Sequence, residues 1–336
     1  MLSVPLLLLA TIAVALVFDF TNGAHDCGNA IATVVSTKAL SPRAAVVMAT
    51  VLNLLGALIG TKVAETVGKG IVRVDPGPGG QVIVFAGLFG AVLWNCATWY
   101  WGLPSSSSHA LIGGLIGAAI VGEGWGALHT GEILHKVVAP LFLSPLCGFA
   151  AGYLSMVGLA WMLRNATRRG TNDRLRHVQV GASALMATAH GLNDAQKTMG
   201  VIALALFIFG RSASVHVPFW VKLICAGAMA AGTMIGGWRI IRTMGQRIFK
   251  MQPVHGVAVA GTSTVVIFAA SLYGAPISTT QTIASSVLGA GASRRLSAVR
   301  WGVGKDMALA WFFTLPCAGL VAAGCCVALR AMGLAG

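Results

Sequence analysis

Two aspartates stand inside long apolar stretches of this sequence, each with amides, glycines and a histidine close by. The chain reads NGAHDCGNA around Asp26 and HGLNDAQK around Asp194. A carboxylate near the centre of a bilayer costs about 2.5–3.5 kcal/mol on insertion scales, so it needs a cation, a proton or a network of donors. Carboxylate and amide oxygens are hard ligands that suit Na⁺ or Mg²⁺-like ions. The pattern therefore predicts a cation-coupling set: Asn22, His25, Asp26, Asn29, His190, Asn193, Asp194 and Gln196.

Other roles for these side chains stay open. The acids and amides could serve only to hold helices together through hydrogen bonds. His25 and His190 either relay protons, because imidazole titrates near neutral pH, or donate hydrogen bonds between helices. Lys197, three residues after Asp194, is expected to neutralise either that aspartate or a substrate.

Hydroxyl side chains gather at two further places, each shortly after a proline. The chain reads PSSSSH from Pro104 and PISTTQ from Pro276, and an apolar run containing glycine follows each motif. Proline and hydroxyl residues are typical of a helix start, where free backbone N–H groups and the positive end of the dipole attract anions. Two such starts that meet near the middle of a membrane would suit a tetrahedral oxyanion. Ordinary helix capping without a ligand is the alternative.

Both kinds of motif recur in the same order in the two halves of the chain. Asp26 and Asp194 are 168 residues apart, and Pro104 and Pro276 are 172 residues apart. Each half holds five candidate membrane segments, and an odd number gives the second copy the opposite orientation. The sequence thus predicts an inverted-topology repeat, which provides secondary transporters with alternating access. The expected parts are a first repeat at 1–163, a short basic cytoplasmic linker at 164–177 and a second repeat at 178–336.

The composition indicates that these motifs lie in a membrane. Of the 336 residues, 56% are hydrophobic and 10% are charged, and the mean hydropathy is +0.81. Soluble domains carry about 25% charged residues. We predict an all-α integral membrane protein of about 10–12 segments, some broken or folded into hairpins, whose first segment is a membrane helix and not a cleaved signal peptide. The ten candidate segments are 2–36, 44–61, 81–101, 105–121, 133–163, 178–209, 216–237, 256–273, 276–292 and 306–333.

The net charge of +14 is spread over loops between the apolar segments and forms no single basic face, which argues against a nucleic-acid partner. The loops 38–43, 164–176, 238–250 and 294–305 together hold 15 Lys and Arg, and they share one side if the segments alternate. The opposite loops hold five basic and four acidic residues. The positive-inside rule then places the basic loops in the cytoplasm and both termini outside.

An oxyanion cannot share a dry site with two carboxylates unless cations bind with it. A membrane potential that is negative inside also opposes anion uptake, by about 2.3 kcal/mol per charge per 100 mV. Binding of H⁺, Na⁺ or a metal–phosphate complex together with the anion resolves both problems. The residues therefore predict symport, although they do not identify the coupled ion.

Taken together, the motifs resemble those of the PiT family of inorganic phosphate transporters, over nearly the whole chain. The stretch GAHDCGNA from Gly23 is similar to the family signature G-A-N-D-x-A-N-A, and HGLNDAQKTMG from His190 resembles its second copy. The motifs after Pro104 and Pro276 resemble the tips of the family's re-entrant hairpins. His25, where sodium-coupled members have Asn, is similar to the bacterial low-affinity branch, which favours H⁺ or metal–phosphate symport over Na⁺.

The resemblance implies a dimeric fold of two inverted repeats in the plasma (inner) membrane that takes up inorganic phosphate, with no cofactor and no enzymatic activity. It implies that a coupling Na⁺ or divalent ion would lie at Asp26, Asn29, Asn193 and Asp194. It also implies phosphate ligands in the hydroxyl motifs: Ser105, Ser106, Ser107, Ser108, Ser278, Thr279, Thr280 and Gln281.

Three other functions compete with phosphate symport. Sulfate has the same shape as phosphate, so a sulfate permease of the same fold is the nearest alternative. A membrane-embedded hydrolase could use Asp26, His25 and His190 around a metal, although catalysis needs one such group of residues and the chain has two. A channel is disfavoured by the paired carboxylates and the expected hairpins.

Overall fold

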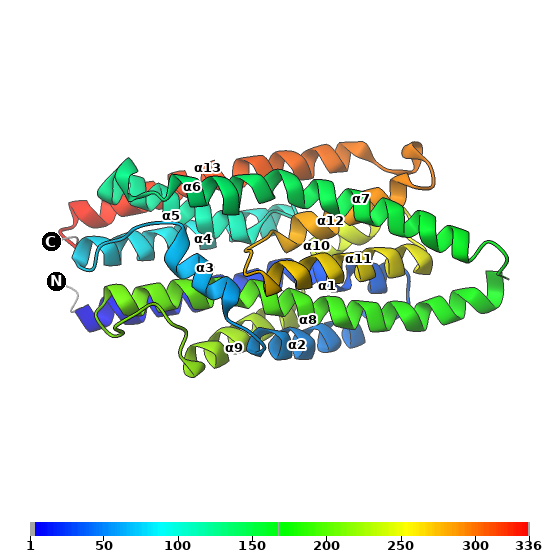
Figure 1. Cartoon of the computed structure of the whole chain (residues 1–336), viewed down its shortest axis with the longest axis horizontal. Coiled ribbons are helices and arrows are strands. Elements are labelled where there is room, and N and C mark those ends of the chain that lie inside the picture. Colours follow the sequence, from blue (N-terminus) through cyan, green and yellow to red (C-terminus); the bar gives the residue numbers. More distant parts are fainter. Residues whose placement is uncertain (1–3, 167, 335–336) are drawn as a thin grey trace.

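The computed structural model describes residues 4–166 and 168–334, and these form a long bundle of helices with both termini at one end (Figure 1). The first half contains α1 (Val4–Ser36), α2 (Pro42–Leu58), α3 (Lys62–Gly70), α4 (Pro78–Trp101), α5 (Ser107–Glu123), α6 (Thr130–Ile133) and α7 (Ala139–Met162). The second half contains α8 (Arg168–Ile208), α9 (Phe219–Ile235), α10 (Trp238–Arg242), α11 (Pro253–Leu272), α12 (Thr279–Ala292) and α13 (Trp301–Ala331). The prediction of an all-α protein is confirmed.

All ten predicted membrane segments coincide with helices in their described residues; residues 2 and 3 of the first segment lie outside that part of the chain. Among the described residues, five helices are long and apolar enough to cross a membrane by themselves, or seven if each of two bent pairs counts as one span. The five are Leu6–Ser36, Pro78–Trp101, Thr130–Met162, Pro253–Leu272 and Trp301–Ala331. The remaining predicted segments differ from simple spans because they are broken, short or charged at one end.

Broken helices occur at two places. The axes of α2 and α3 meet at 69°, and those of α9 and the following stretch Trp238–Arg247 meet at 60°. At the first break, Gln196 Oε1 accepts a 2.9 Å hydrogen bond from the backbone N–H of Val63, one of the unpaired donors at the start of α3. At the second break, Gly236 has a φ of +77°, which glycine adopts without steric cost.

Two helical hairpins end in the hydroxyl motifs. Gly102, with a φ of +68°, turns the chain from α4 into α5, and Gly274, with a φ of +69°, turns it from α11 towards α12. The 17 residues of α5 and the 14 of α12 correspond to roughly 26 and 21 Å at 1.5 Å per residue, less than the ~30 Å of a hydrocarbon core. Both helices therefore begin inside the protein, where their first turns are buried.

Close helix packing at glycines holds these parts together. A Cβ atom built on Gly23 would lie 2.2 Å from the carbonyl oxygen of Met229, and one on Gly232 would lie 1.9 Å from that of Phe20. The pair α2 and α8 repeats this contact, because a Cβ on Gly56 would lie 2.1 Å from the carbonyl oxygen of Thr188. Small residues that let backbones touch are typical of helix contacts in membranes.

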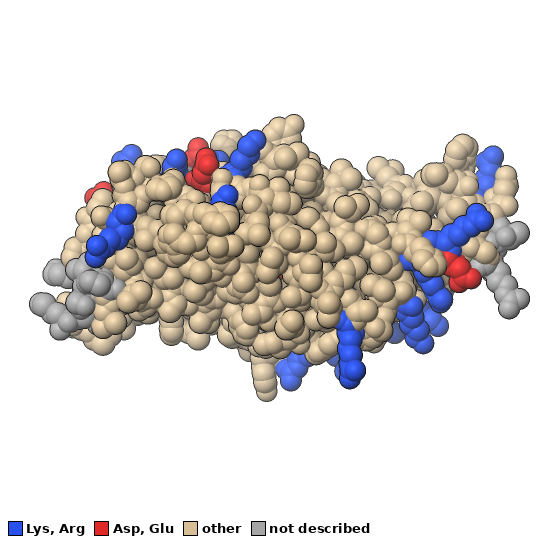
Figure 2. All heavy atoms as spheres, turned by 90° about the horizontal axis from the view of Figure 1, so that it is seen from below, with Lys and Arg blue, Asp and Glu red and all other residues tan. Residues whose placement is uncertain are grey.

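The outer surface matches a lipid environment. Large apolar side chains are exposed along several helices, including Leu154 at 66%, Phe142 at 62% and Leu320 at 72%. Most of the surface seen in Figure 2 carries no charge; the charged side chains lie toward the two ends of the long axis and, along the lower edge, also near its middle. A largely uncharged surface of this kind is typical of a protein that crosses a bilayer.

The stretch expected as a loop at 164–176 is helical from Arg168 onward, because α8 begins there. Arginine has a high helix propensity, so the charged turns continue the membrane helix beyond the apolar region. The predicted linker at 164–177 is therefore largely the first turns of a 41-residue helix.

Gly232→Ala is expected to lower the free energy of unfolding by about 1–3 kcal/mol, because its new methyl group would overlap the backbone of α1. The matched control is Gly227→Ala in the same helix, where a Cβ meets nothing within 4 Å. Thermal unfolding in detergent measures both. Equal melting temperatures for the two variants would contradict the close packing of α1 and α9.

Candidate binding site

Asp26 is fully buried in the second half of α1 and accepts hydrogen bonds from both hairpin tips. Ser107 Oγ, at the start of α5, donates to Asp26 Oδ2 at 3.0 Å, and Thr280 Oγ1, at the start of α12, donates to Oδ1 at 3.1 Å. The neighbouring His25 Nδ1 lies 2.7 Å from Oδ1. One carboxylate of α1 thus joins two hairpins that are far apart in the sequence.

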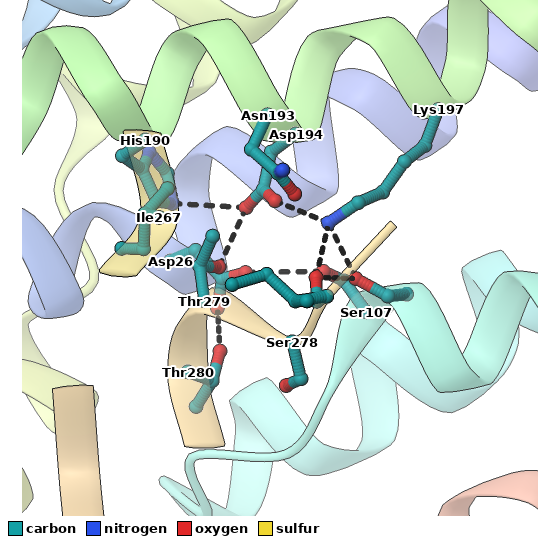
Figure 3. A network of polar contacts seen from close by, with 12 residues as sticks. Asp26, Ser107, His190, Asn193, Asp194, Lys197, Ile267, Ser278, Thr279 and Thr280 are labelled. Atoms are coloured by element: carbon teal, nitrogen blue, oxygen red, sulfur yellow. Dashed lines mark hydrogen bonds and ion pairs between the residues drawn. The ribbon is translucent and has the colours of Figure 1, made fainter. Parts of the chain in front are cut away.

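Asp194 is fully buried in α8 and has a comparable set of partners (Figure 3). Thr279 Oγ1 donates to Asp194 Oδ2 at 2.9 Å, and Lys197 Nζ donates to Oδ1 at 2.5 Å. His190 Nε2 lies 3.0 Å from Oδ2, one helical turn before the aspartate. Unlike Asp26, this carboxylate has a full cation as its partner.

Lys197 links α8 to both hairpin tips. Besides Asp194, its ammonium group donates to Ser108 Oγ at 2.6 Å and to the carbonyl oxygen of Ile277 at 3.0 Å. Ser108 Oγ in turn donates to the same carbonyl at 3.3 Å. Figure 3 shows the Lys197 side chain reaching from its helix to this point. The two predicted hydroxyl clusters therefore touch each other, and both are buried.

The hydrogen bonds around the two aspartates correspond to each other. Ser107 donates to Asp26 as Thr279 donates to Asp194, with distances of 3.0 and 2.9 Å. One turn further along each of these helices, Asn29 Nδ2 donates to Thr280 Oγ1 at 2.8 Å, and Lys197 donates to Ser108 Oγ. The first tip thus contacts α1 with Ser107 and α8 with Ser108, and the second tip contacts α8 with Thr279 and α1 with Thr280.

Two of the predicted anion ligands act as helix caps. Ser106 Oγ accepts a 3.2 Å hydrogen bond from His109 N–H, and Ser278 Oγ accepts one of the same length from Gln281 N–H. The first N–H groups of a helix have no acceptor within the helix, and the positive end of the dipole lies beside them. Two such helix starts meet the same buried cluster, which gives it donors suited to an anion.

Each histidine reaches another segment through one ring nitrogen, while the other nitrogen faces the aspartate of its own helix. His190 Nδ1 lies 3.1 Å from Asn53 Oδ1 on α2, and Asn53 Nδ2 donates to Thr233 Oγ1 on α9 at 3.3 Å. On the other side, His25 Nε2 lies 3.2 Å from the carbonyl oxygen of Leu103. The role as an interhelical donor, left open by the sequence, is therefore visible for both residues.

A cation could bind among the acids at the centre. Ligand atoms of Asp26, His190 and Asp194 all lie within 4.8 Å of one another, and all three residues are buried. Two carboxylates and an imidazole form a donor set that suits a proton or a divalent ion better than a soft metal. The buried oxygens Asn29 Oδ1 and Asn193 Oδ1, on the same two helices as the aspartates, have no hydrogen-bond partner.

Some predicted residues lie beside this cluster without joining it. Gln196 points to the break between α2 and α3, and Ser105 Oγ donates to Thr98 Oγ1 at 2.8 Å. Asn193 Nδ2 donates to Ser271 Oγ at 2.9 Å. Asn22 and Gln281 are buried, and Asn22 Oδ1 and both side-chain polar atoms of Gln281 have no hydrogen-bond partner.

One buried acid escaped the motif analysis. Asp19 on α1 is fully buried, its Oδ1 accepts a 2.7 Å hydrogen bond from Thr198 Oγ1 on α8, and its Oδ2 has no partner. The signal was available, because Asp19 stands in an apolar run as Asp26 does. It was missed because it lies outside the repeated motif.

Comparison with known proteins places this geometry in a family. The chain matches the phosphate transporter family over residues 22–174 and 162–322, and it belongs to that family. It is 45% identical over 315 residues to a probable low-affinity inorganic phosphate transporter of Bacillus subtilis. The aligned region covers 93% of this chain and 94% of that protein. It is 44% identical over 321 residues to one of Rhizobium meliloti, with 95% of each chain covered.

A solved structure has the same fold. It is described as the sodium-dependent phosphate transporter, with a TM-score of 0.84, 22% sequence identity and coverage of 97% of this chain and 99% of that chain. The predicted class is thereby confirmed: the chain is a multi-pass membrane transporter and not an enzyme. The hypothesis of a membrane-embedded hydrolase is set aside.

Lys197→Met should lower the free energy of unfolding by about 3–5 kcal/mol, because it leaves the Asp194 carboxylate buried without its cation. Adding Asp194→Asn to the same chain should recover much of this loss, since the uncompensated charge is gone. Thermal unfolding of the two single variants and the double variant gives the coupling energy. If the losses of unfolding free energy in the two single variants add up to the loss in the double variant, Lys197 and Asp194 are not energetically coupled.

Proposed function

We propose that this protein carries inorganic phosphate across the membrane together with a cation, by alternating access. The observation that carries the proposal is the meeting of two helix starts and their hydroxyls with two carboxylates at one buried point. Donors from the helix starts would replace the water around an oxyanion, and the carboxylates would recruit its counter-ions. The names of the relatives, which are phosphate transporters, support the same substrate.

The position of the acids favours phosphate over sulfate. Near neutral pH phosphate carries at least one proton, whereas sulfate carries none. Asp26 lies at the start of both short helices and accepts hydrogen bonds there from Ser107 and Thr280. An acceptor among the donors would receive a hydrogen bond from the phosphate O–H group and would repel sulfate. A site built for a hydrogen-bonding partner discriminates strongly against an analogue that lacks it.

The coupled cation is proposed to be H⁺ or the metal of a metal–phosphate complex, with Na⁺ as the alternative. The grouping of Asp26, His190 and Asp194 within 4.8 Å supports either a shared proton or a divalent ion. The solved structure with the same fold is described as sodium-dependent, which keeps Na⁺ open. A neutral imidazole or carboxylate pair can take up a proton without any change of fold.

Alternating access is proposed to rest on an inverted repeat. In Figure 1, α1 begins at the end that carries the termini, and α8 begins at the opposite end. The corresponding contacts of Asp26 with Ser107 and of Asp194 with Thr279 support this relation. Because the central cluster is buried from both ends, transport requires the hairpins to move.

Orientation and assembly are also proposed from the charge pattern and the family resemblance. The four basic loops would face the cytoplasm of a cell whose plasma membrane holds the protein, with both termini outside. The protein would function as a homodimer. Labelling of the C-terminus from outside intact cells tests the orientation.

Ser107→Ala combined with Thr279→Ala should reduce phosphate uptake by roughly tenfold or more, because each hydroxyl contacts a carboxylate and borders the proposed anion. The control is Ser293→Ala with Thr264→Ala, whose hydroxyls bond only to carbonyls of their own helices. Uptake of labelled phosphate into proteoliposomes measures the effect. If the double variant takes up phosphate as fast as its control, these hydroxyls do not contribute to phosphate binding. Inhibition of wild-type phosphate uptake by excess sulfate would favour a sulfate permease.

Asp26→Asn should make uptake insensitive to an imposed pH gradient, because the amide cannot take part in proton exchange. The wild type is expected to take up phosphate faster when the outside is more acidic. Phosphate uptake into proteoliposomes with an imposed pH or Na⁺ gradient shows whether H⁺ or Na⁺ is the coupled ion. An unchanged response of Asp26→Asn to the pH gradient would remove this carboxylate from the coupling step.

A further inference from the structure

We propose that the ammonium group of Lys197 permanently fills a cation position of the binding site, so that no metal cation is needed beside Asp194. This inference rests on the proposed phosphate transport, and it adds which half of the site holds the exchangeable cation. It assigns to Lys197 a role in ion specificity, beyond the neutralisation expected from the sequence.

The surroundings of Lys197 Nζ are those of a small cation site. Its three oxygen partners are a carboxylate of Asp194 at 2.5 Å, a hydroxyl of Ser108 at 2.6 Å and a backbone carbonyl of Ile277 at 3.0 Å. Carboxylate, hydroxyl and carbonyl oxygens are the ligands of hard metal ions in proteins. An ammonium group has three donors and no acceptor, so this shell uses all of them.

The first half of the site has an amide at the corresponding position. Asn29 follows Asp26 by three residues, as Lys197 follows Asp194, and Asn29 and Lys197 are 168 residues apart, as the two aspartates are. Asn29 Nδ2 donates to Thr280, as Lys197 donates to Ser108. Each residue therefore joins its own helix to the opposite hairpin through the second residue of the tip's helix start.

The Asp26 half and the Asp194 half of the site differ in whether an oxygen remains available to bind a cation. Asn29 Oδ1 is buried without a hydrogen-bond partner, so an oxygen next to Asp26 stays available for a cation. Beside Asp194 that place is taken by the side chain of Lys197, which is 3% exposed. The fixed positive charge offsets one carboxylate in every state of the transport cycle. An exchangeable cation is then needed only on the Asp26 side.

A different role for Lys197 makes a different prediction. A lysine that bound the phosphate directly would do so as a point charge, so its removal would weaken phosphate binding without creating a Na⁺ response in the absence of phosphate. A lysine that only stabilised the fold would leave ion dependence unchanged when removed. The test must therefore combine removal of the charge with addition of a cation.

The experiment compares Lys197→Asn with the wild type in NaCl and in N-methylglucamine chloride of equal ionic strength. Thermal unfolding of purified protein in detergent is the first readout, because a bound ion stabilises the folded state. We expect Na⁺ to raise the melting temperature of Lys197→Asn by several degrees more than that of the wild type. An equal effect of Na⁺ on both proteins would overturn the proposal.

Phosphate uptake into proteoliposomes is the second readout. Without Na⁺, the rate of phosphate uptake by Lys197→Asn should be lower than that of the wild type by an order of magnitude or more, because the charge of Asp194 is left uncompensated. Na⁺ should restore part of this loss, whereas the wild type and Lys197→Arg, which keeps the charge, should gain no more than twofold. A loss that Na⁺ does not relieve would contradict the built-in cation.

Two controls keep the outcome interpretable. Lys62→Asn removes a lysine that donates to the carbonyl oxygen of Leu272 at 3.2 Å near the same hairpin, and it should acquire no sodium response. Lys197→Gln replaces Lys197→Asn if the latter does not fold. If the wild type itself takes up no phosphate, the proposed function fails, while the sodium effect on the melting temperature of Lys197→Asn still decides the inference.

Discussion

The structure depends on one constraint, which is that charges removed from water must be compensated within the protein. Asp26 and Asp194 have no exposed surface, and each is compensated by groups from other helices. Two hydroxyls and a histidine surround the first, whereas an ammonium group, a hydroxyl and a histidine surround the second. Removing one member of such a buried set costs several kcal/mol. This requirement draws two long helices and two hairpin tips to a single point.

The helix architecture makes that point accessible to an anion. Because α5 and α12 are too short to span a bilayer, their starts lie inside the protein and direct unpaired N–H groups to the centre. Glycine contacts such as Gly23 against Met229 let α1 and α9 pack with their backbones touching, and α2 and α8 pack in the same way. Rigid pairs of this kind can move as units while the site between them stays intact.

The sequence predicts the parts of this site better than their exact partners. The ten helical segments, the buried aspartates and the two hydroxyl motifs follow from composition and from the repeat. Side-chain direction separates two of the predicted residues: residues two apart on a helix point to different sides, so Gln196 faces the break between α2 and α3 while Asp194 faces the cluster. A spacing of three places side chains on one face, which is why Lys197 joins the site. Contacts between distant segments, such as Asn53 with His190, leave no local pattern.

The most direct test of the account is an experimental structure of the protein with phosphate bound. We predict density for the anion between the starts of α5 and α12, within hydrogen-bond distance of Ser107 or Thr279 and of the first backbone N–H groups of both helices. Density only at the basic surface pocket that includes Arg294 and Arg295, with the central cluster unchanged, would contradict the account.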